Sequence, residues 1–401
     1  MKLLILSYIT AMCGATEFNI SLRKEALDSG IEIEIAYSNN LKNDQAGITE
    51  IFNNKIIKQI PNLTDAVFNV WKKINSLGIV NKFTGEKLVD YIKDNNIDII
   101  ICCHEYAMQR ASVLKSKHQL NIPCFGLVTN YFDSGTLKNL NLDGYFLPNQ
   151  EVFENFKKAG IETNKLYVTG LPISEKFLWN ISKIEARNYL AIPTDKKIYL
   201  VHTEGMNDKN IISLCVALSK NMLQNSIAIV LLDRYSNAIG KLENNLGKNS
   251  NINIVIFNDK INYYMNAADV LISKPISYLQ TEASSCKIPV VHVFASSDYE
   301  RKNAQILEDE RVSAFAQNED IACEMANEII RDKDIIDEIN KNSEIYIIQN
   351  GARNIIEIIK NLKKEWLWKK LLLKTLQKIM ALVVVFLMCL SKLTKVKFLD
   401  F

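Results

Sequence analysis

The chain has 401 residues, of which 48% are hydrophobic and 23% charged, and its formal net charge is +3. This composition is typical of a globular protein with enough core for two domains, and so small a net charge argues against nucleic acid as a partner. The 8 cysteines are scattered and the 4 histidines are dispersed, so we expect buried reduced thiols, no metal centre and no cofactor.

The N-terminal part of the chain alternates short apolar strands with helices. Strands are predicted at residues 3–8, 31–37 and 99–103, and helices at residues 17–29 and 88–95. This order is typical of a doubly wound parallel α/β sheet. The first apolar run is too short for a signal peptide, so we expect a cytoplasmic domain.

His104 follows the strand at residues 99–103, at the sheet edge where open α/β sheets bind their ligands. The position suits either a group that takes a proton near neutral pH or a structural hydrogen bond. Another strand, at residues 122–128, leads to Asn130 at the same edge.

The C-terminal part repeats the alternation and is organised around residues 269–304. A strand at 270–272 is followed by Pro275 and by a predicted helix over residues 278–286 with Ser277 as its N-cap. A helix that begins at the carboxyl end of a buried parallel strand binds anions, because its free N–H groups and its dipole point outward there.

Carboxylates lie close to this predicted anion site. Glu282 is about a turn and a half into the helix, where it can accept from a sugar hydroxyl beside a bound phosphate. The next strand, at residues 288–294, ends in a predicted loop that carries Asp298, Glu300 and Asn303. An ordinary βαβ unit with surface acids would show the same pattern.

These residues resemble the nucleotide-sugar half of the monogalactosyldiacylglycerol synthase and processive diacylglycerol glucosyltransferase family, to which the peptidoglycan N-acetylglucosaminyltransferase is related. That family has Lys-Pro-Gly-Gly-x-Thr-x-x-Glu, then Gly-Gln-Glu-x-x-Asn. Here Lys274, Pro275 and Glu282 match the first motif, and Glu300 and Asn303 match the second. Residues 143–148 and 170–173 match two further motifs of the family.

The resemblance implies the GT-B fold, which consists of two facing Rossmann-like domains, here with a C-terminal basic apolar helix added. We expect an acceptor-side domain at residues 1–175, a nucleotide-sugar domain at residues 176–364 and a membrane-associating tail at residues 365–401. The implied activity is that of an inverting, metal-independent hexosyltransferase, which uses a UDP-sugar donor and a lipid or other hydroxyl acceptor. In that family the region equivalent to residues 48–84 faces the lipid acceptor, although amphipathic helices packed on the sheet would fit this sequence equally well.

The resemblance also implies two groups of site residues. The candidate catalytic residues are His104, Glu17 and Thr16. The candidate substrate-binding residues are Lys274, Ser277, Glu282, Glu300, Asn303, Gly205, Phe257 and Asn130. Thr16 stands where the family has a histidine, and a threonine is no base near neutral pH, so His104 or Glu17 would have to take the proton. Asn130 stands where the family has an aspartate.

The tail differs in composition from the rest of the chain. Residues 366–401 contain seven lysines and one aspartate, and the apolar run at residues 379–390 is much shorter than the roughly 20 residues of a spanning helix. Lysines and tryptophans around a short apolar helix favour a helix that lies on an anionic leaflet. A short spanning helix and a helix packed on the protein's own core are the alternatives. We therefore expect a cytoplasmic protein that is peripheral on the cytoplasmic face of the membrane.

Two other functions remain open from the sequence. The missing motif glycines, Thr16 and Asn130 favour a non-catalytic relative that binds a nucleotide sugar, a lipid or a partner subunit. A UDP-sugar epimerase shares the two-domain plan but does not need a basic apolar tail.

Overall fold

The computed structural model of the chain describes residues 1–7, 15–37, 86–117, 119–132, 135–137, 139–232, 236, 238–246, 251–362, 364, 375–376 and 378–380. It divides into two compact units, Met1–Arg353 and Asn354–Phe401. The first unit contains both of the predicted sheets. The predicted acceptor region at residues 48–84 and most of the predicted tail lie outside the described residues.

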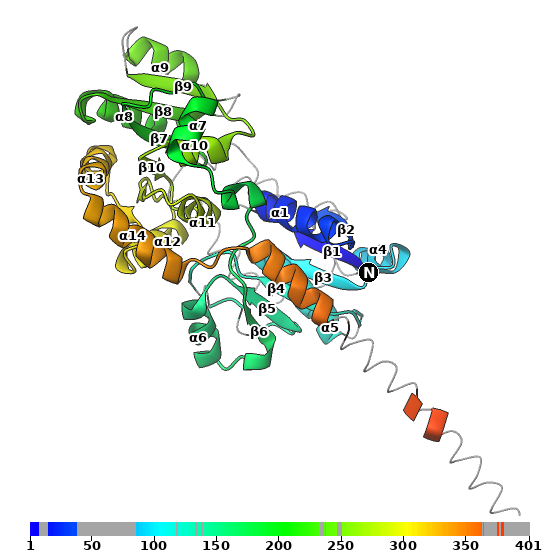
Figure 1. Cartoon of the computed structure of the whole chain (residues 1–401). Coiled ribbons are helices and arrows are strands. Elements are labelled where there is room, and N and C mark those ends of the chain that lie inside the picture. The colour runs from blue at the N-terminus through cyan, green and yellow to red at the C-terminus, as the bar shows by residue number, and fades with distance from the viewer. Residues whose placement is uncertain are drawn as a thin grey trace, which may run out of the picture. The chain divides into compact units, whose positions relative to one another are not determined.

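The first sheet has six strands in the order β2-β1-β3-β4-β5-β6 (Figure 1). All of its neighbouring strands run parallel, and the order reverses direction between β1 and β3. Its strands are β1 (Lys2–Ser7), β2 (Glu32–Tyr37), β3 (Ile99–Cys102), β4 (Cys124–Leu127), β5 (Gly144–Leu147) and β6 (Leu166–Val168). Its helices are α1 (Ala15–Asp28), α4 (Glu86–Asp94), α5 (Glu105–Ser116), α6 (Gln150–Lys158) and the 3-10 helix η3 (Thr163–Lys165).

The second sheet also has six parallel strands, in the order β12-β11-β10-β7-β8-β9, and its order reverses between β7 and β10. Its strands are β7 (Lys197–His202), β8 (Ser226–Leu232), β9 (Ile252–Ile256), β10 (Val270–Ser273), β11 (Val290–His292) and β12 (Ala314–Phe315). Its helices are α8 (Asp208–Asn221), α9 (Ala238–Leu246), α10 (Ile261–Ala267), α11 (Ser277–Ser285), α12 (Asp298–Asp309), α13 (Glu319–Arg331) and α14 (Lys333–Tyr346). The 3-10 helix η4 (Glu175–Leu178) and helix α7 (Lys183–Tyr189) connect the two sheets.

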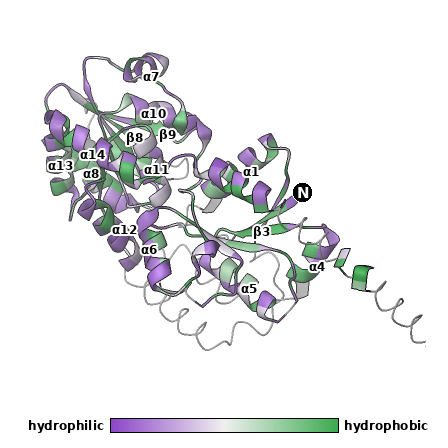
Figure 2. Cartoon of the chain, turned by 60° about the horizontal axis from the view of Figure 1, so that its bottom comes forward, coloured by the Kyte–Doolittle hydropathy of each residue, from purple (hydrophilic) through white to green (hydrophobic). Residues whose placement is uncertain are grey.

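The two doubly wound sheets confirm the fold that the sequence predicts. The central strands are apolar and buried, as strands covered on both faces must be, and β3 is coloured hydrophobic in Figure 2, whereas the edge strands β2 and β9 are partly exposed. Each sheet has its own core of buried residues. Most predicted elements differ from the observed ones only by a few residues at their ends, for example residues 288–294 against β11 (Val290–His292).

An aspartate directly before a strand fixes the neighbouring strand in three places. Asp98 accepts from the backbone N–H of Lys2 at 2.9 Å, and Asp143 accepts from that of Cys124 at 2.7 Å. Asp269 accepts from the backbone N–H of Ile198 at 2.8 Å. Each carboxylate pairs a strand's first N–H group beyond the end of the ladder, so these aspartates set the register at the amino edge of both sheets.

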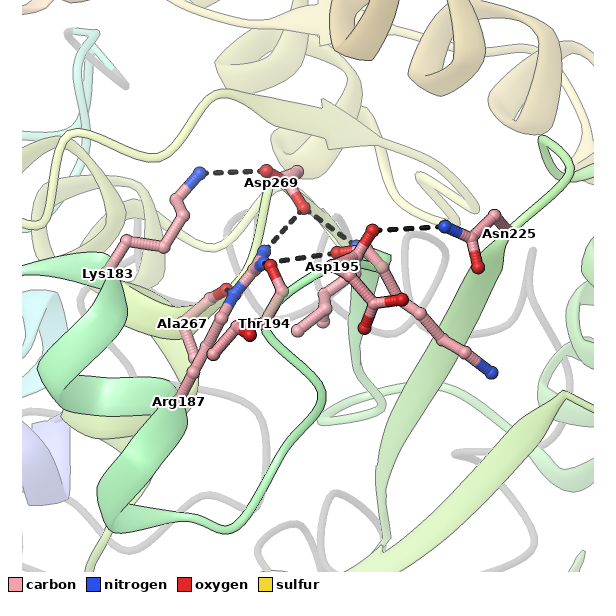
Figure 3. Close-up of polar contacts among 9 residues, drawn as sticks. Lys183, Arg187, Thr194, Asp195, Asn225, Ala267 and Asp269 are labelled. Carbon is pink, nitrogen blue, oxygen red and sulfur yellow. Dashed lines mark hydrogen bonds and ion pairs between the residues drawn. The ribbon is translucent and has the colours of Figure 1, made fainter.

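Asp269 belongs to a polar network beside the second sheet (Figure 3). Arg187 is 5% exposed, and its guanidinium lies 2.8 Å from Asp269 Oδ2. The same guanidinium donates to the carbonyl oxygens of Ala267, Thr194 and Lys196 at 2.9 to 3.1 Å. Because its donors are paired, this buried charge connects α7 to the start of β10 without an unsatisfied group.

The segments at residues 170–171 and 348–351 pack against each other through glycines, and we call this contact the crossing. A Cβ atom on Gly170, where φ is +83°, would lie 2.3 Å from the carbonyl oxygen of Ile348. A Cβ atom on Gly351 would lie 2.4 Å from the carbonyl oxygen of Leu171. Only glycine lets two backbones approach this closely, so the crossing depends on both residues.

Candidate functional site

The candidate site begins at the carboxyl edge of the second sheet. The last residues of three adjacent strands lie in register there, because Ser273 pairs with His202 on one side and with His292 on the other. The reversal of strand order between β7 and β10 falls at the same edge. In open α/β sheets, ligands bind outside the carboxyl ends of strands at such a switch point.

Helix α11 starts at this edge without a side-chain cap. Its N-cap residue is Ile276, so the prediction that Ser277 caps the helix is wrong, and Ser277 is instead the first helical residue. The hydroxyl of Ser277 points to the side-chain oxygens of Asn130, at 3.4 Å, and Asn303, at 3.5 Å. Helices α5, α6, α7, α8, α12, α13 and α14 each have a side-chain cap.

The first turn of α11 is buried although it is uncapped. Ser277, Tyr278 and Leu279 are 6%, 3% and 1% exposed. A helix start leaves backbone N–H groups that need acceptors, and a buried start without a cap is therefore a position where a ligand can supply them.

Glu282 is a buried carboxylate in the second turn of the same helix. It is 4% exposed, and no hydrogen bond to its carboxylate is found among the described residues, although its oxygens are not fully enclosed. Burial raises the pKa of Glu282 well above its usual value, and the negative charges of Glu17 and Glu204 raise it further, while the charge of Lys176 lowers it. A buried carboxylate without a donor is costly, so this position favours a ligand that brings hydroxyl groups.

Glu204 and Tyr278 belong to the same cluster, and the sequence did not single them out. The hydroxyl of Tyr278 donates to the carboxylate of Glu204. Desolvation of this carboxylate raises the pKa of Glu204, although the residue as a whole is exposed, and the charge of Glu17 adds to the effect. Glu204 follows β7 directly at the sheet edge, which is the signal that could have identified it.

Glu17 comes to this cluster from the first sheet's side of the unit. It lies in the first turn of α1 and is exposed, and the neighbouring Phe18 ring contacts Tyr278 with centroids 6.1 Å apart. The structure therefore brings the predicted residues Glu17 and Glu282 together. Thr16 precedes Glu17 in the same turn, but its side chain is outside the described residues.

Lys274 and Glu300 are also brought together, as an ion pair. The ammonium of Lys274 lies 2.7 Å from Glu300 Oε1 and donates to Ser296 Oγ at 2.9 Å. The side chain of Lys274 is 5% exposed and that of Glu300 is 25% exposed. The backbone at Gly205, where φ is +74°, lies close to the lysine side chain: a Cβ atom on Gly205 would lie 3.2 Å from Lys274 Cδ.

The predicted loop with Asp298, Glu300 and Asn303 is wrong, because these residues form the first turns of helix α12. Ser297 caps the helix by accepting from the backbone N–H of Glu300, and the Glu300 carboxylate accepts in return from that of Ser297. This reciprocal pair is a capping box, and its Ser-x-x-Glu spacing was visible in the sequence.

Asn303 and Asn130 hold the two sheets' loops together at the start of α11. Asn303 is 2% exposed, donates to the carbonyl of Pro275 at 3.3 Å and accepts from the backbone N–H of Tyr131 at 3.3 Å. Asn130 donates to the hydroxyl of Tyr299 at 2.8 Å. These contacts cover one side of the helix start with the loop that follows β4.

Phe257 lies beyond the end of β9 and is 46% exposed. Its ring packs edge-on against His202, with centroids 5.1 Å apart. Burial lowers the pKa of His202 to about 4, so this histidine is neutral under physiological conditions. An exposed aromatic ring at this edge gives an apolar surface beside the predicted base-binding backbone at Phe257.

His104 has a structural role, because it caps helix α5. Its Nδ1 accepts from the backbone N–H of Tyr106 at 3.1 Å, which assigns the ring proton to Nε2 in the neutral form. Burial lowers the pKa of His104 below its usual value. The nitrogen lone pair is used by the cap, so the geometry favours the structural alternative over a general base.

Comparison with known proteins places the chain among glycosyltransferases. The model of the monogalactosyldiacylglycerol (MGDG) synthase family matches residues 22–173. The processive diacylglycerol beta-glucosyltransferase of Bacillus pumilus is 22% identical over 298 residues, which are 74% of this chain and 76% of the relative. The chain is therefore similar to this family, at low sequence identity. The resemblance predicted from the sequence is confirmed.

A further relative and a solved structure are also similar to this chain over most of its length. The UDP-N-acetylglucosamine--N-acetylmuramyl-(pentapeptide) pyrophosphoryl-undecaprenol N-acetylglucosamine transferase of Acetivibrio thermocellus is 24% identical over 290 residues, 68% of this chain and 75% of the relative. The structure of UDP-GlcNAc 2-epimerase from Neisseria meningitidis, bound to UDP-GlcNAc, aligns with a TM-score of 0.58 at 14% identity and covers 90% of this chain and 100% of the epimerase. The GT-B fold is thereby confirmed.

Among the described residues, none of the helices combines the length and the apolar character that crossing a bilayer requires. In the same part of the chain, no three histidine, cysteine or acidic side chains converge as a metal site would need.

Proposed function

We propose that the chain is an inverting glycosyltransferase that moves a hexose from a UDP-sugar to a diacylglycerol-type lipid or another hydroxyl acceptor. The observation that carries the proposal is the pairing of two features on one helix. The start of α11 is buried and uncapped, and Glu282 further along α11 is a largely buried carboxylate whose pKa is raised by desolvation. A nucleoside diphosphate suits both features, since its phosphates accept hydrogen bonds and its ribose hydroxyls donate them.

The donor is assigned to the site as follows. The diphosphate accepts from the backbone N–H groups of the first turn of α11, which begins at Ser277, and Glu282 accepts from the ribose hydroxyls. The backbone at Phe257 holds the base. Glu300 accepts from hydroxyls of the hexose, and Gly205 allows the loop after β7 to approach the donor. In this arrangement, backbone dipoles meet the charge of the departing diphosphate without a metal ion.

In the proposed reaction, the acceptor hydroxyl oxygen forms a bond to the anomeric carbon from the face opposite the leaving group. The bond between that carbon and the diphosphate oxygen breaks, and its electron pair leaves with UDP, so the anomeric configuration inverts. The proton of the hydroxyl passes to a carboxylate, which we assign to Glu17. The support for Glu17 is its position among Tyr278, Glu204 and Glu282, whereas His104 is engaged as a helix cap.

The lipid acceptor is supported by the activities of the relatives and by the tail. Three of the five described residues at 375–376 and 378–380 are apolar and about half or more exposed, namely Leu376 at 47%, Ile379 at 50% and Met380 at 68%. Exposed apolar side chains among lysines suit a helix on an anionic membrane surface, in keeping with a protein at the cytoplasmic face.

A second candidate function is binding of a nucleotide sugar without transfer. It is favoured by Asn130, which stands where the family has an aspartate and is engaged with Tyr299 and Ser277. An amide at this position holds a hydroxyl but takes no proton.

One experiment separates these functions. The purified full-length chain is incubated with radiolabelled UDP-glucose, UDP-galactose or UDP-N-acetylglucosamine and with liposomes of diacylglycerol and anionic phospholipid. The lipid and the sugar nucleotides are then separated by chromatography. Label in the lipid supports the transferase, and its loss in the Glu17→Gln variant supports the base. UDP binding without transfer supports the second candidate, and interconversion of the sugars would overturn both in favour of an epimerase.

A further inference from the structure

The Lys274–Glu300 ion pair gives Lys274 a different role in the donor site from the diphosphate binding that the Lys-Pro motif implies. A lysine beside a helix start that binds phosphate is expected to neutralise the diphosphate directly. Here the ammonium is already bonded to Glu300 Oε1 at 2.7 Å and to Ser296 Oγ at 2.9 Å. With its side chain only 5% exposed, Lys274 has little access to any other anion.

Glu300 is held at several points, and each contact fixes its orientation. Oε1 binds Lys274, and Oε2 accepts from the backbone N–H of Ser296 at 2.7 Å and from its hydroxyl at 2.9 Å. The capping box with Ser297 fixes the backbone of Glu300 as well. A carboxylate with this many donors is held in one orientation, which is what a precise acceptor of sugar hydroxyls needs.

Diphosphate binding by Lys274 would require this arrangement to break. Moving the ammonium away would leave Glu300, whose side chain is 25% exposed, without its only cationic partner among the described residues. Separating a largely buried ion pair is costly, because each charge loses its compensation. The uncapped start of α11 offers the diphosphate another set of donors at no such cost.

The side chain of Asn303 is already hydrogen-bonded within the protein, so we assign sugar recognition to Glu300. Asn303 is 2% exposed, and its amide group is occupied by Pro275, Tyr131 and Ser277. Of the two residues matched to the family's Glu-x-x-Asn motif, only Glu300 keeps an exposed part of its side chain.

We infer that Lys274 is a positioning residue for hexose recognition: it holds the Glu300 carboxylate in place for the sugar hydroxyls and does not bind the diphosphate. The inference rests on the proposed nucleotide-sugar function. It extends that function by assigning the selectivity for the sugar, as opposed to the affinity for UDP, to this ion pair.

The test compares two ligands, UDP and UDP-glucose, by calorimetric titration of the full-length chain. In Lys274→Met we expect the affinity for UDP to stay within about 2-fold of the wild type, because the helix start is intact. The affinity for UDP-glucose should fall by about 10-fold, the effect of losing one hydrogen bond to a charged group. A purely structural defect would weaken both ligands together.

The Glu300→Gln variant keeps the test decisive if Lys274→Met does not fold. It should show the same selective loss of UDP-glucose, and the double variant should lose no more than either single variant, since the two residues act as one unit. Equal weakening of UDP and UDP-glucose in Lys274→Met would overturn the inference, as would unchanged UDP-glucose binding in Glu300→Gln. Absence of UDP binding by the wild type would instead refute the proposed function.

Discussion

Replacing Glu282 by glutamine should stabilise the ligand-free protein while weakening its binding of UDP. The side chain is 4% exposed and has no donor among the described residues. A buried polar group without a hydrogen bond costs about 1–3 kcal/mol, and a charge costs more. Glutamine keeps the shape and removes the charge, so we expect Glu282→Gln to raise the free energy of unfolding by about 1–3 kcal/mol near pH 8.

The gain should depend on pH in one direction. Burial raises the pKa of Glu282 well above 4.5, its value in the unfolded chain, so the folded state binds the proton more tightly. At a pH below 4.5 the carboxyl is protonated in both states and the penalty is absent. As the pH rises from that value toward the folded-state pKa, the wild type loses stability that the variant keeps.

Thermal unfolding of the full-length chain, followed by circular dichroism at about pH 4 and about pH 8, measures this difference. The variant should match the wild type at the lower pH and should unfold at a temperature higher by about 2–4 °C per kcal/mol at the higher pH. Glu310→Gln, at an exposed position, is the matched control and should change stability by less than about 0.5 kcal/mol. Equal melting shifts at both pH values would refute the reasoning, as would a destabilised variant.

Three other substitutions test single contacts. In a urea titration, Arg187→Met should lower the free energy of unfolding by about 3–5 kcal/mol, because Asp269 stays buried without its guanidinium partner. The control Arg311→Met, which breaks an exposed ion pair, should lower it by less than about 1 kcal/mol. Gly351→Ala should cost about 1–3 kcal/mol in that titration, because its Cβ atom would meet a backbone oxygen at 2.4 Å; a neutral result would mean that the crossing relaxes freely. His104→Asn should keep both stability and transferase activity, since asparagine also caps helices. A stable His104→Asn variant whose activity is reduced about 100-fold or more would instead indicate that His104 is the catalytic base.

The sequence predicted the sheets because their central strands are apolar runs. It also predicts that the candidate site lies at the carboxyl edge, since the carboxyl ends of parallel strands share one edge. The three aspartates that precede β3, β5 and β10 have a structural role that the sequence motifs did not indicate. Two of them, Asp143 and Asp269, fall within motifs shared with the family, yet in this structure they pair a neighbouring strand's first N–H group.

The errors have two different physical origins. The capping box of Ser297 and Glu300 is local in sequence, so the start of α12 was predictable from its spacing. The roles of Ser277 and His104 were not, because each depends on a partner brought by folding. The Ser277 hydroxyl points to Asn130, 147 residues away, and the donation from Tyr278 to Glu204 spans 74 residues. Contacts between residues so far apart in the sequence cannot be predicted from the residue spacing within either segment.

The most direct test of the central claim is a structure of the full-length chain in complex with UDP. We predict diphosphate oxygens about 2.7–3.2 Å from backbone N–H groups of the first turn of α11, with a ribose hydroxyl donating to Glu282 and with the Lys274–Glu300 pair intact. UDP bound at any other place, or a first turn of α11 that stays closed to UDP at saturating concentration, would contradict the account.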